Sequence, residues 1–174
     1  MDVNTPLIFT DGTDFYNSLF KNSIRHKKGL FILAPSGSGK TFYITRQKVN
    51  DWIDGDTLWS TANADLTNDE WENDMNIVME TNNRCDIITE QAKKQGFWVM
   101  GSSNNWLRPD AIVLPPWNIH KKYVTNRESN DYDGGAKNEN LSELKAHRKI
   151  IKQWMKVGVP CFMSIAEAAH YLSK

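Results

Sequence analysis

One stretch of the chain, residues 29–41, constrains the fold and the chemistry more than any other. Its sequence is Gly-Leu-Phe-Ile-Leu-Ala-Pro-Ser-Gly-Ser-Gly-Lys-Thr. The apolar run Leu30–Leu33 predicts a buried strand, and a helical pattern follows the small residues after it. This order matches the phosphate-binding loop G-x-x-x-x-G-K-[ST], except that Ala34 replaces the first glycine. Alanine is also small, so we expect the loop to accept it.

Each residue type in this loop has a physical role in holding phosphate. Gly37 and Gly39 permit positive φ angles and close approach of the backbone to a ligand. Successive N–H groups then form a nest for anionic oxygens, and a helix predicted over residues 41–50 adds its dipole. The Lys40 ammonium can reach the β and γ phosphates, and the Thr41 hydroxyl can ligate Mg²⁺. We therefore predict that ATP and Mg²⁺ bind at Ser36, Gly37, Ser38, Gly39, Lys40 and Thr41. The alternative is a Gly/Ser-rich turn that joins a strand to a helix.

The amino-acid composition is typical of a soluble globular protein. Its 174 residues, 40% apolar and 24% charged, predict one soluble domain spanning residues 1–174. A formal net charge of zero gives no global electrostatic case for a nucleic acid or a membrane. Cys85 and Cys161 lack the spacing of a disulfide framework or metal site, which favours a reducing, cytoplasmic setting. The first residues do not resemble a secretory signal, and no apolar run approaches the length of a membrane span.

Strand and helix patterns alternate along the chain. Further strands are predicted at residues 52–53, 97–101, 111–114 and 159–163. Helices are predicted at residues 14–26, 67–95, 118–128, 140–157 and from 164 onward. Capping boxes beginning at Thr67, Asn140 and Ser164 mark helix starts, Gly96 marks a helix end, and a break is expected near residues 81–83. Residues 1–28 form an N-terminal extension, residues 60–66 a loop and residues 128–139 a lid loop. The alternation predicts an α/β fold with a parallel sheet and helices on both faces.

A second signal follows the strand at residues 52–53. Asp54-Gly55-Asp56 leaves the carboxyl end of that strand, where open α/β sheets bind their ligands. Asp54 can hold Mg²⁺ beside Thr41, and Asp56 can bind an acceptor hydroxyl and take its proton during phosphoryl transfer. The alternative is a strand-to-helix turn in which an aspartate caps the helix.

Basic residues farther along the chain supply the third signal. Phosphoryl transfer develops charge on three equatorial oxygens, which an arginine or lysine must approach. The candidates are Lys121, Lys122, Arg127, Lys137 and Arg148. Arg127 is the first choice, because it closes a helix just before the glycine-bearing lid loop. The alternative for Arg127 is a solvated helix terminus. Arg108 and Ser102 are predicted to bind substrate, whereas His120, His147 and His170 are given no role.

Together these residues resemble the small P-loop kinases. The Ala34–Thr41 loop and the Asp-Gly-Asp segment are similar to the corresponding parts of gluconate, shikimate and adenylyl-sulfate kinases. The order of later elements is also similar to that of nucleoside monophosphate kinases. The resemblance implies a P-loop NTPase three-layer α/β/α sandwich with a five-stranded parallel sheet in order 2-3-1-4-5. It implies catalytic roles for Lys40, Asp56 and Arg127, with Mg²⁺ at Thr41 and Asp54.

The chain also departs from these families. In the segment after the predicted third strand, this chain shares only Ser102-Ser103 with gluconate kinases, which continue there with basic residues. In the predicted lid loop, Lys and Asn stand where nucleotide kinases have several arginines. The identity of the phosphoryl acceptor therefore cannot be inferred from any one of these families. The leading hypothesis is an ATP- and Mg²⁺-dependent phosphotransferase acting on a hydroxyl or phosphate of a small metabolite or nucleotide. One alternative is a polynucleotide 5′-kinase, which the neutral net charge argues against. The other is a regulatory protein that binds ATP without turnover.

Overall fold

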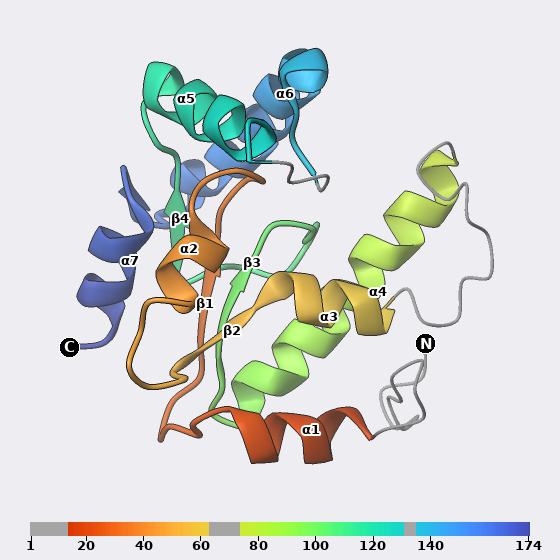
Figure 1. Cartoon of the computed structure of the whole chain (residues 1–174). Helices are drawn as coiled ribbons and strands as arrows, with labels where there is room; N and C mark the ends of the chain where they lie inside the picture. Colours follow the sequence, from red (N-terminus) through yellow and green to blue (C-terminus); the bar gives the residue numbers. More distant parts are fainter. Residues whose placement is uncertain (1–13, 63–73, 131–134) are drawn as a thin grey trace. The chain divides into compact units, whose positions relative to one another are not determined.

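The computed structural model describes residues 14–62, 74–130 and 135–174, which divide into two compact units. The first unit runs to Leu30 and continues over Gln47–Leu107. The second unit comprises Phe31–Arg46 and Arg108–Lys174. The chain has an α/β fold with one parallel five-stranded sheet in the order β2-β3-β1-β4-β5, which confirms the predicted strand order (Figure 1).

Strands and helices alternate as the sequence pattern predicts. The strands are β1 (Leu30–Leu33), β2 (Trp52–Asp54), β3 (Trp98–Gly101), β4 (Ala111–Val113) and β5 (Cys161–Phe162). The α-helices are α1 (Phe15–Asn22), α2 (Lys40–Ile44), α3 (Gly55–Ala62), α4 (Met75–Lys94), α5 (Trp117–Glu128), α6 (Leu141–Lys152) and α7 (Ile165–Leu172). Two 3₁₀ turns flank α6, namely η2 (Asn138–Asn140) and η3 (Gln153–Val157). No helix in the described ranges is both long and apolar enough to span a membrane.

The first unit is built on the pairing of β2 with β3. Asp54 lies opposite Met100 in the parallel register, so both strands end at the same edge. Helix α4 ends at Lys94 with Gln95 as its C-cap, and Gly96 follows with a φ of 92°, in the region that favours glycine, which confirms the predicted helix stop. A side chain there would also clash, because a Cβ would lie 2.1 Å from the carbonyl oxygen of His26.

A buried carboxylate anchors the loop that follows β3. Asp86 on α4 is fully buried and accepts hydrogen bonds from the Asn104 amide and from the backbone N–H groups of Asn105, Trp106 and Leu107, at 2.7–3.2 Å. Burial raises the pKa of Asp86, while these four hydrogen bonds act in the opposite direction. No sequence pattern singles out Asp86, yet its hydrogen bonds hold the loop that begins with Ser102.

The second unit is built on β1, β4 and β5. All four residues of β1 are buried, as their apolar run predicts. The Asp110 carboxylate accepts from the backbone N–H of Phe31 at 2.7 Å, and the Asp110 N–H donates to the Phe31 carbonyl at 2.8 Å, which ties β1 to the start of β4. Helix α7 opens with the predicted capping box of Ser164 and Glu167.

Three element predictions were wrong. The helix predicted over residues 41–50 ends at Ile44, because residues 45–50 are all exposed and offer no apolar face. Residues 60–62 are helical, since α3 begins directly after β2 and buries Leu58, Thr61 and Ala62. The break expected near residues 81–83 is absent, because α4 continues through them with Thr81 buried.

Some predicted features are outside the described residues or differ in detail. The Thr67 capping box and residues 131–134 of the predicted lid loop lie outside them. Asn140 does not cap α6 with its side chain. Its Oδ1 accepts instead from the Lys137 N–H at 2.7 Å and shapes η2.

Candidate nucleotide-binding site

The loop between β1 and α2 has the backbone geometry that the motif predicts. Gly37 and Gly39 have φ angles of 75° and 94°, in the left-handed region that favours glycine. A Cβ at Gly37 would lie 2.8 Å from Cγ2 of Val124 on α5, so a side chain at this position would require Val124 to shift. The Ser38 N–H donates to the Pro35 carbonyl at 3.3 Å and closes the turn. The strand-loop-helix context expected of a phosphate-binding loop is therefore present.

The Lys40 ammonium is held inside this loop. Its side chain is only 6% exposed, and Nζ donates to the carbonyls of Ala34 and Pro35 at 3.3 and 3.2 Å. Beside it in sequence, the Ser38 hydroxyl is buried and has no hydrogen-bond partner among the described residues. Gly39 has no heavy atom within 4 Å of the place a Cβ would take. A buried cation, an unsatisfied hydroxyl and open space at a left-handed glycine fit a phosphate group.

A buried histidine braces the loop from α5. His120 Nε2 lies 2.8 Å from the Ser36 carbonyl oxygen, and Nδ1 lies 2.8 Å from Nη1 of Arg148. Arginine can only donate, so Nδ1 accepts and Nε2 carries the proton that is donated to Ser36. The pKa of His120 is lowered to about 4, chiefly because the ring is buried. The hydrogen bond to Ser36 acts in the opposite direction, and the charges of Arg148, Lys40 and Arg127 add to the lowering. His120 is therefore neutral at physiological pH.

This state of His120 predicts a specific pH dependence of stability. An unfolded histidine takes up a proton near pH 6.5, whereas the folded one resists protonation until about pH 4. The stabilisation is therefore complete above pH 6.5 and is lost as the pH falls toward 4. We expect wild type to lose about 3 kcal/mol more free energy of unfolding than His120→Gln between pH 7 and pH 4.

Urea unfolding across this pH range measures the difference. Glutamine can donate to Ser36 and accept from Arg148 but cannot titrate. His170→Gln, at an exposed histidine on α7, is the matched control and should follow the wild-type profile. Parallel profiles for wild type and His120→Gln would contradict the assignment.

Arg127 also lies against the loop. The Ser36 hydroxyl accepts from the Ala136 N–H at 3.0 Å, and Arg127 Nη2 donates to the carbonyl of the same residue. A Cβ at Gly135 would lie 2.3 Å from Ser36 Oγ and 3.6 Å from Arg127 Nη2, which shows how closely the three residues approach. The structure thus brings Lys40, Ser36 and Arg127 together within the second unit.

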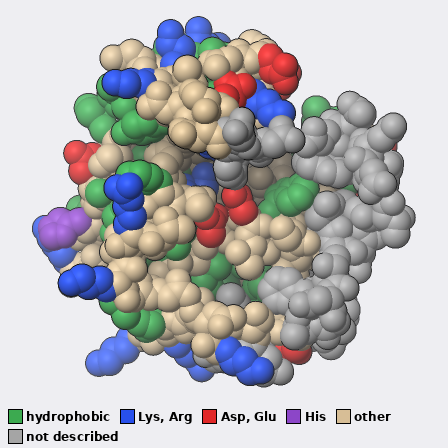
Figure 2. Space-filling view, in the orientation of Figure 1, with side chains coloured by type: hydrophobic (Ala, Val, Ile, Leu, Met, Phe, Trp, Pro, Cys, Tyr) green, Lys and Arg blue, Asp and Glu red, His purple; other side chains and the backbone are tan. Residues whose placement is uncertain are grey.

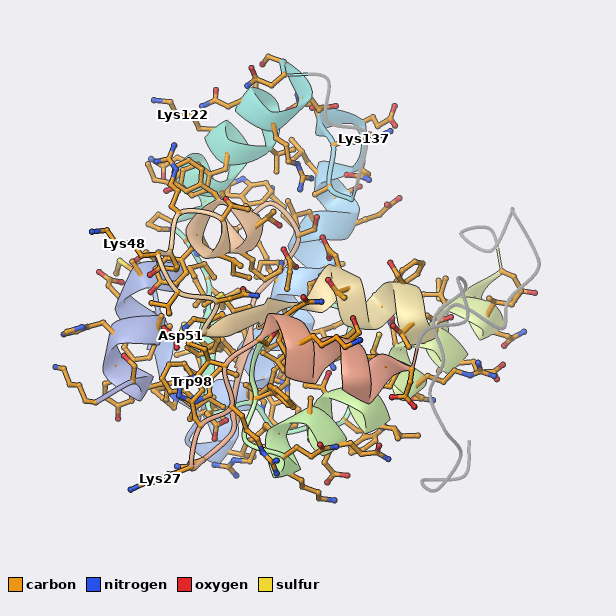
Figure 3. The ribbon with its side chains drawn as sticks, turned by 60° about the horizontal axis from the view of Figure 1, so that its bottom comes forward. Lys27, Lys48, Asp51, Trp98, Lys122 and Lys137 are labelled. Atoms are coloured by element: carbon orange, nitrogen blue, oxygen red, sulfur yellow. The ribbon has the colours of Figure 1, made fainter. Side chains whose placement is uncertain are left out.

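The other basic candidates are placed differently. Arg148 reaches the loop indirectly through His120 and also donates to the Pro115 carbonyl at 2.8 Å. Lys121 and Lys122 are exposed on α5, and Figure 3 shows the Lys122 side chain extending outward. Lys137 is half-buried just before η2. Arg127 therefore remains the first choice among the candidate cations.

Asp54, Asp56 and Ser102 belong to the first unit. The Asp54 carboxylate accepts from the Asp56 N–H at 3.1 Å and so caps α3, while Asp56 is exposed in the first turn of that helix. Ser102 follows β3, whose end lies beside that of β2. These side chains therefore share the carboxyl edge of two strands. Their approach to Lys40 and Thr41, which belong to the second unit, stays a prediction.

Arg108 occupies a place that does not suit its predicted role. It precedes β4 and donates to the Val157 carbonyl at 2.8 Å. Since β1 and β4 are parallel and the loop follows the carboxyl end of β1, Arg108 lies at the opposite end of these strands. This contact supports a structural role for Arg108.

The sequence alone left His120 without a role. Its spacing from Trp117 and Val124 on α5 places it on the inward face of that helix, which was the available sign of burial. Its partner at Ser36 is 84 residues away, and no local pattern indicates such a contact.

No protein-family model matches the chain, and no curated protein matches it either. Among the described residues, no group of three or more His, Cys, Asp or Glu side chains is arranged to hold a metal ion. The function of the chain must therefore be inferred from the geometry of the phosphate-binding loop and the residues that contact it.

Proposed function

We propose that this protein is an ATP- and Mg²⁺-dependent phosphotransferase with a P-loop NTPase fold, acting on a hydroxyl or phosphate of a small metabolite or nucleotide. One observation carries the proposal. The Lys40 ammonium is buried in a loop with two left-handed glycines, beside the unsatisfied hydroxyl of Ser38, and Arg127 is tethered to the same loop through Ala136. A lysine buried inside a loop with left-handed glycines, beside a buried hydroxyl that lacks a partner, fits a phosphate-binding loop better than a turn with a purely structural role.

The side chains around the loop divide the work of binding and transfer. Lys40 and the loop N–H groups hold the terminal phosphates, with less help from a dipole than predicted, because α2 has only five residues. Arg127 stabilises the charge that develops on the transferring group. Asp56 orients the acceptor hydroxyl and takes its proton, and Thr41 and Asp54 would hold Mg²⁺. ATP supplies the phosphoryl group when bound.

Two linked measurements test this proposal. The first is binding of ATP with and without Mg²⁺. The second is ADP release in the presence of nucleoside monophosphates, sugars, sugar acids and short oligonucleotides. We expect Mg²⁺-dependent ATP binding and ADP release that one acceptor class accelerates. Absence of ATP binding would overturn the phosphate-loop assignment. ATP binding with no stimulation by any acceptor would support the regulatory alternative instead.

A further inference from the structure

The zero net charge of the chain conceals a strong separation of charge. The second unit contains 13 Lys and Arg residues and 7 Asp and Glu residues, a formal charge of +6. The first unit contains 8 Lys and Arg residues and 14 Asp and Glu residues, a formal charge of −6. The net charge of zero is the sum of these two values, so it does not exclude a nucleic-acid partner for the second unit. The second unit is the one that carries the phosphate-binding loop.

Three cations of the second unit surround one aromatic ring. The Trp117 ring on α5 has Lys121 Nζ at 5.9 Å, Lys145 Nζ at 5.0 Å and Arg148 Cζ at 5.6 Å from its centroid. The negative face of an indole ring attracts such cations. We call these four residues, contributed by α5 and α6, the Trp117 cation cluster.

The charges of this cluster are not neutralised by the described protein. Lys121 and Lys145 are exposed and have no carboxylate partner among the described residues. Arg148 bonds to a carbonyl and to neutral His120. Like charges gathered on one ring repel each other, and an anion bound between them would relieve that repulsion. The cluster is therefore suited to a phosphate group.

Further lysines extend the basic surface beyond the reach of one phosphate. Lys122 on α5 and Lys149 and Lys152 on α6 are exposed. Figure 2 shows several Lys and Arg side chains at the top of the view, with some Asp and Glu side chains beside them. Lys145 and Lys152 are seven residues apart, which is about 10 Å along a helix. The acidic residues of α5 and α6 are Glu128 and Glu143 alone. This extent suits a row of phosphates.

The cluster is also connected to the loop. The Trp117 ring lies edge-on to the His120 ring, with centroids 6.2 Å apart, and His120 donates to the Ser36 carbonyl of the loop. A nucleic-acid strand bound to the cluster would therefore pass close to the phosphate-binding loop.

We infer that the Trp117 cation cluster and its flanking lysines bind the backbone of a single-stranded nucleic acid, and that the acceptor is the 5′-hydroxyl of that strand. This inference rests on the proposed phosphotransferase function and names its substrate class. The 5′-oxygen forms a bond to the γ-phosphorus of ATP as the bond to the β–γ bridging oxygen breaks. The electron pair of that bond leaves with ADP, and the hydroxyl proton passes to the Asp56 carboxylate.

The test is binding of a fluorescent oligothymidylate without ATP, between about 50 and 200 mM KCl. The variant is Lys121→Ala with Lys145→Ala. Loss of two backbone contacts should lower the slope of log affinity against log salt by about 1.4 and weaken binding about tenfold or more at low salt. The matched control is Lys27→Ala with Lys48→Ala, which removes two exposed lysines of the first unit that point outward in Figure 3. It should change the affinity less than about twofold.

Circular dichroism confirms that both double variants fold. Failure of wild type to bind the oligonucleotide, or equal weakening by the control pair, would overturn the inference. Binding of polyglutamate as tightly as the oligonucleotide would also overturn it, because that result would indicate an acidic protein partner. The same holds if the Lys121→Ala, Lys145→Ala variant loses affinity for ATP but keeps its affinity for the oligonucleotide. ATP binding without oligonucleotide binding would overturn this inference alone. Oligonucleotide binding without ATP binding would support the docking surface and overturn the phosphotransferase.

Discussion

Lys40→Met is expected to weaken ATP binding about 100-fold and to reduce phosphotransfer below detection. The Lys40 ammonium is buried within the loop, so its hydrogen bonds to phosphate would be charge-assisted, and such bonds contribute about 1.5–3 kcal/mol. Methionine keeps the unbranched stem and its packing but has no charge. Calorimetric titration with Mg²⁺–ATP and an ADP-release assay measure the two effects.

The control for this substitution is Lys156→Met, which removes an equal charge from an exposed position in η3. It should leave ATP affinity unchanged. Thermal unfolding of both variants shows whether each still folds. A folded Lys40→Met protein that binds ATP as tightly as wild type would rule out the loop as the phosphate site.

Asp56→Asn is expected to slow phosphotransfer by roughly 10²–10⁴-fold while leaving ATP affinity nearly unchanged. Positioned general bases contribute effects of this size, and an amide cannot accept the acceptor proton. Asp56 is exposed, so its replacement should cost little stability. Single-turnover transfer and ATP titration separate the two effects.

Asp54→Asn gives a comparison at the neighbouring carboxylate. Asparagine is also a good N-cap, so α3 should keep its start. The proposed role of Asp54 at Mg²⁺ predicts a higher Mg²⁺ concentration for half-maximal activity, with the pH dependence unchanged. Full activity of Asp56→Asn would show that Asp56 is not the base.

Local sequence patterns predicted the elements whose causes are local. A continuous apolar run gave β1, a capping box gave the start of α7, and Gly96 gave the end of α4. Each depends on residues within a few positions of one another. Errors arose where burial decided whether a helix ends or continues. Helix α2 is short because residues 45–50 have no apolar face to bury, and α4 continues through residues 81–83 because Thr81 is buried.

In the candidate site, too, local sequence patterns predicted some features and contacts between distant residues determined others. The loop from Ala34 to Thr41 could be found in the sequence, because its chemistry is contiguous. The position of Arg127 against that loop depends on Ala136, which bonds to Ser36 across 100 residues. The role of His120 depends on contacts with Ser36 and Arg148, 84 and 28 residues away. No periodic pattern encodes contacts at such separations.

The sequence by itself determined the order of strands and helices and the phosphate-binding loop, because hydrophobic period, capping and glycine conformations act over short stretches. Only the tertiary structure decided which side chains brace the loop and how charge is distributed. The second unit joins residues 31–46 to residues 108–174, so its formal charge of +6 is assembled from two separated segments. A sum along the whole chain cancels that charge, whereas folding collects it in the unit that carries the phosphate-binding loop.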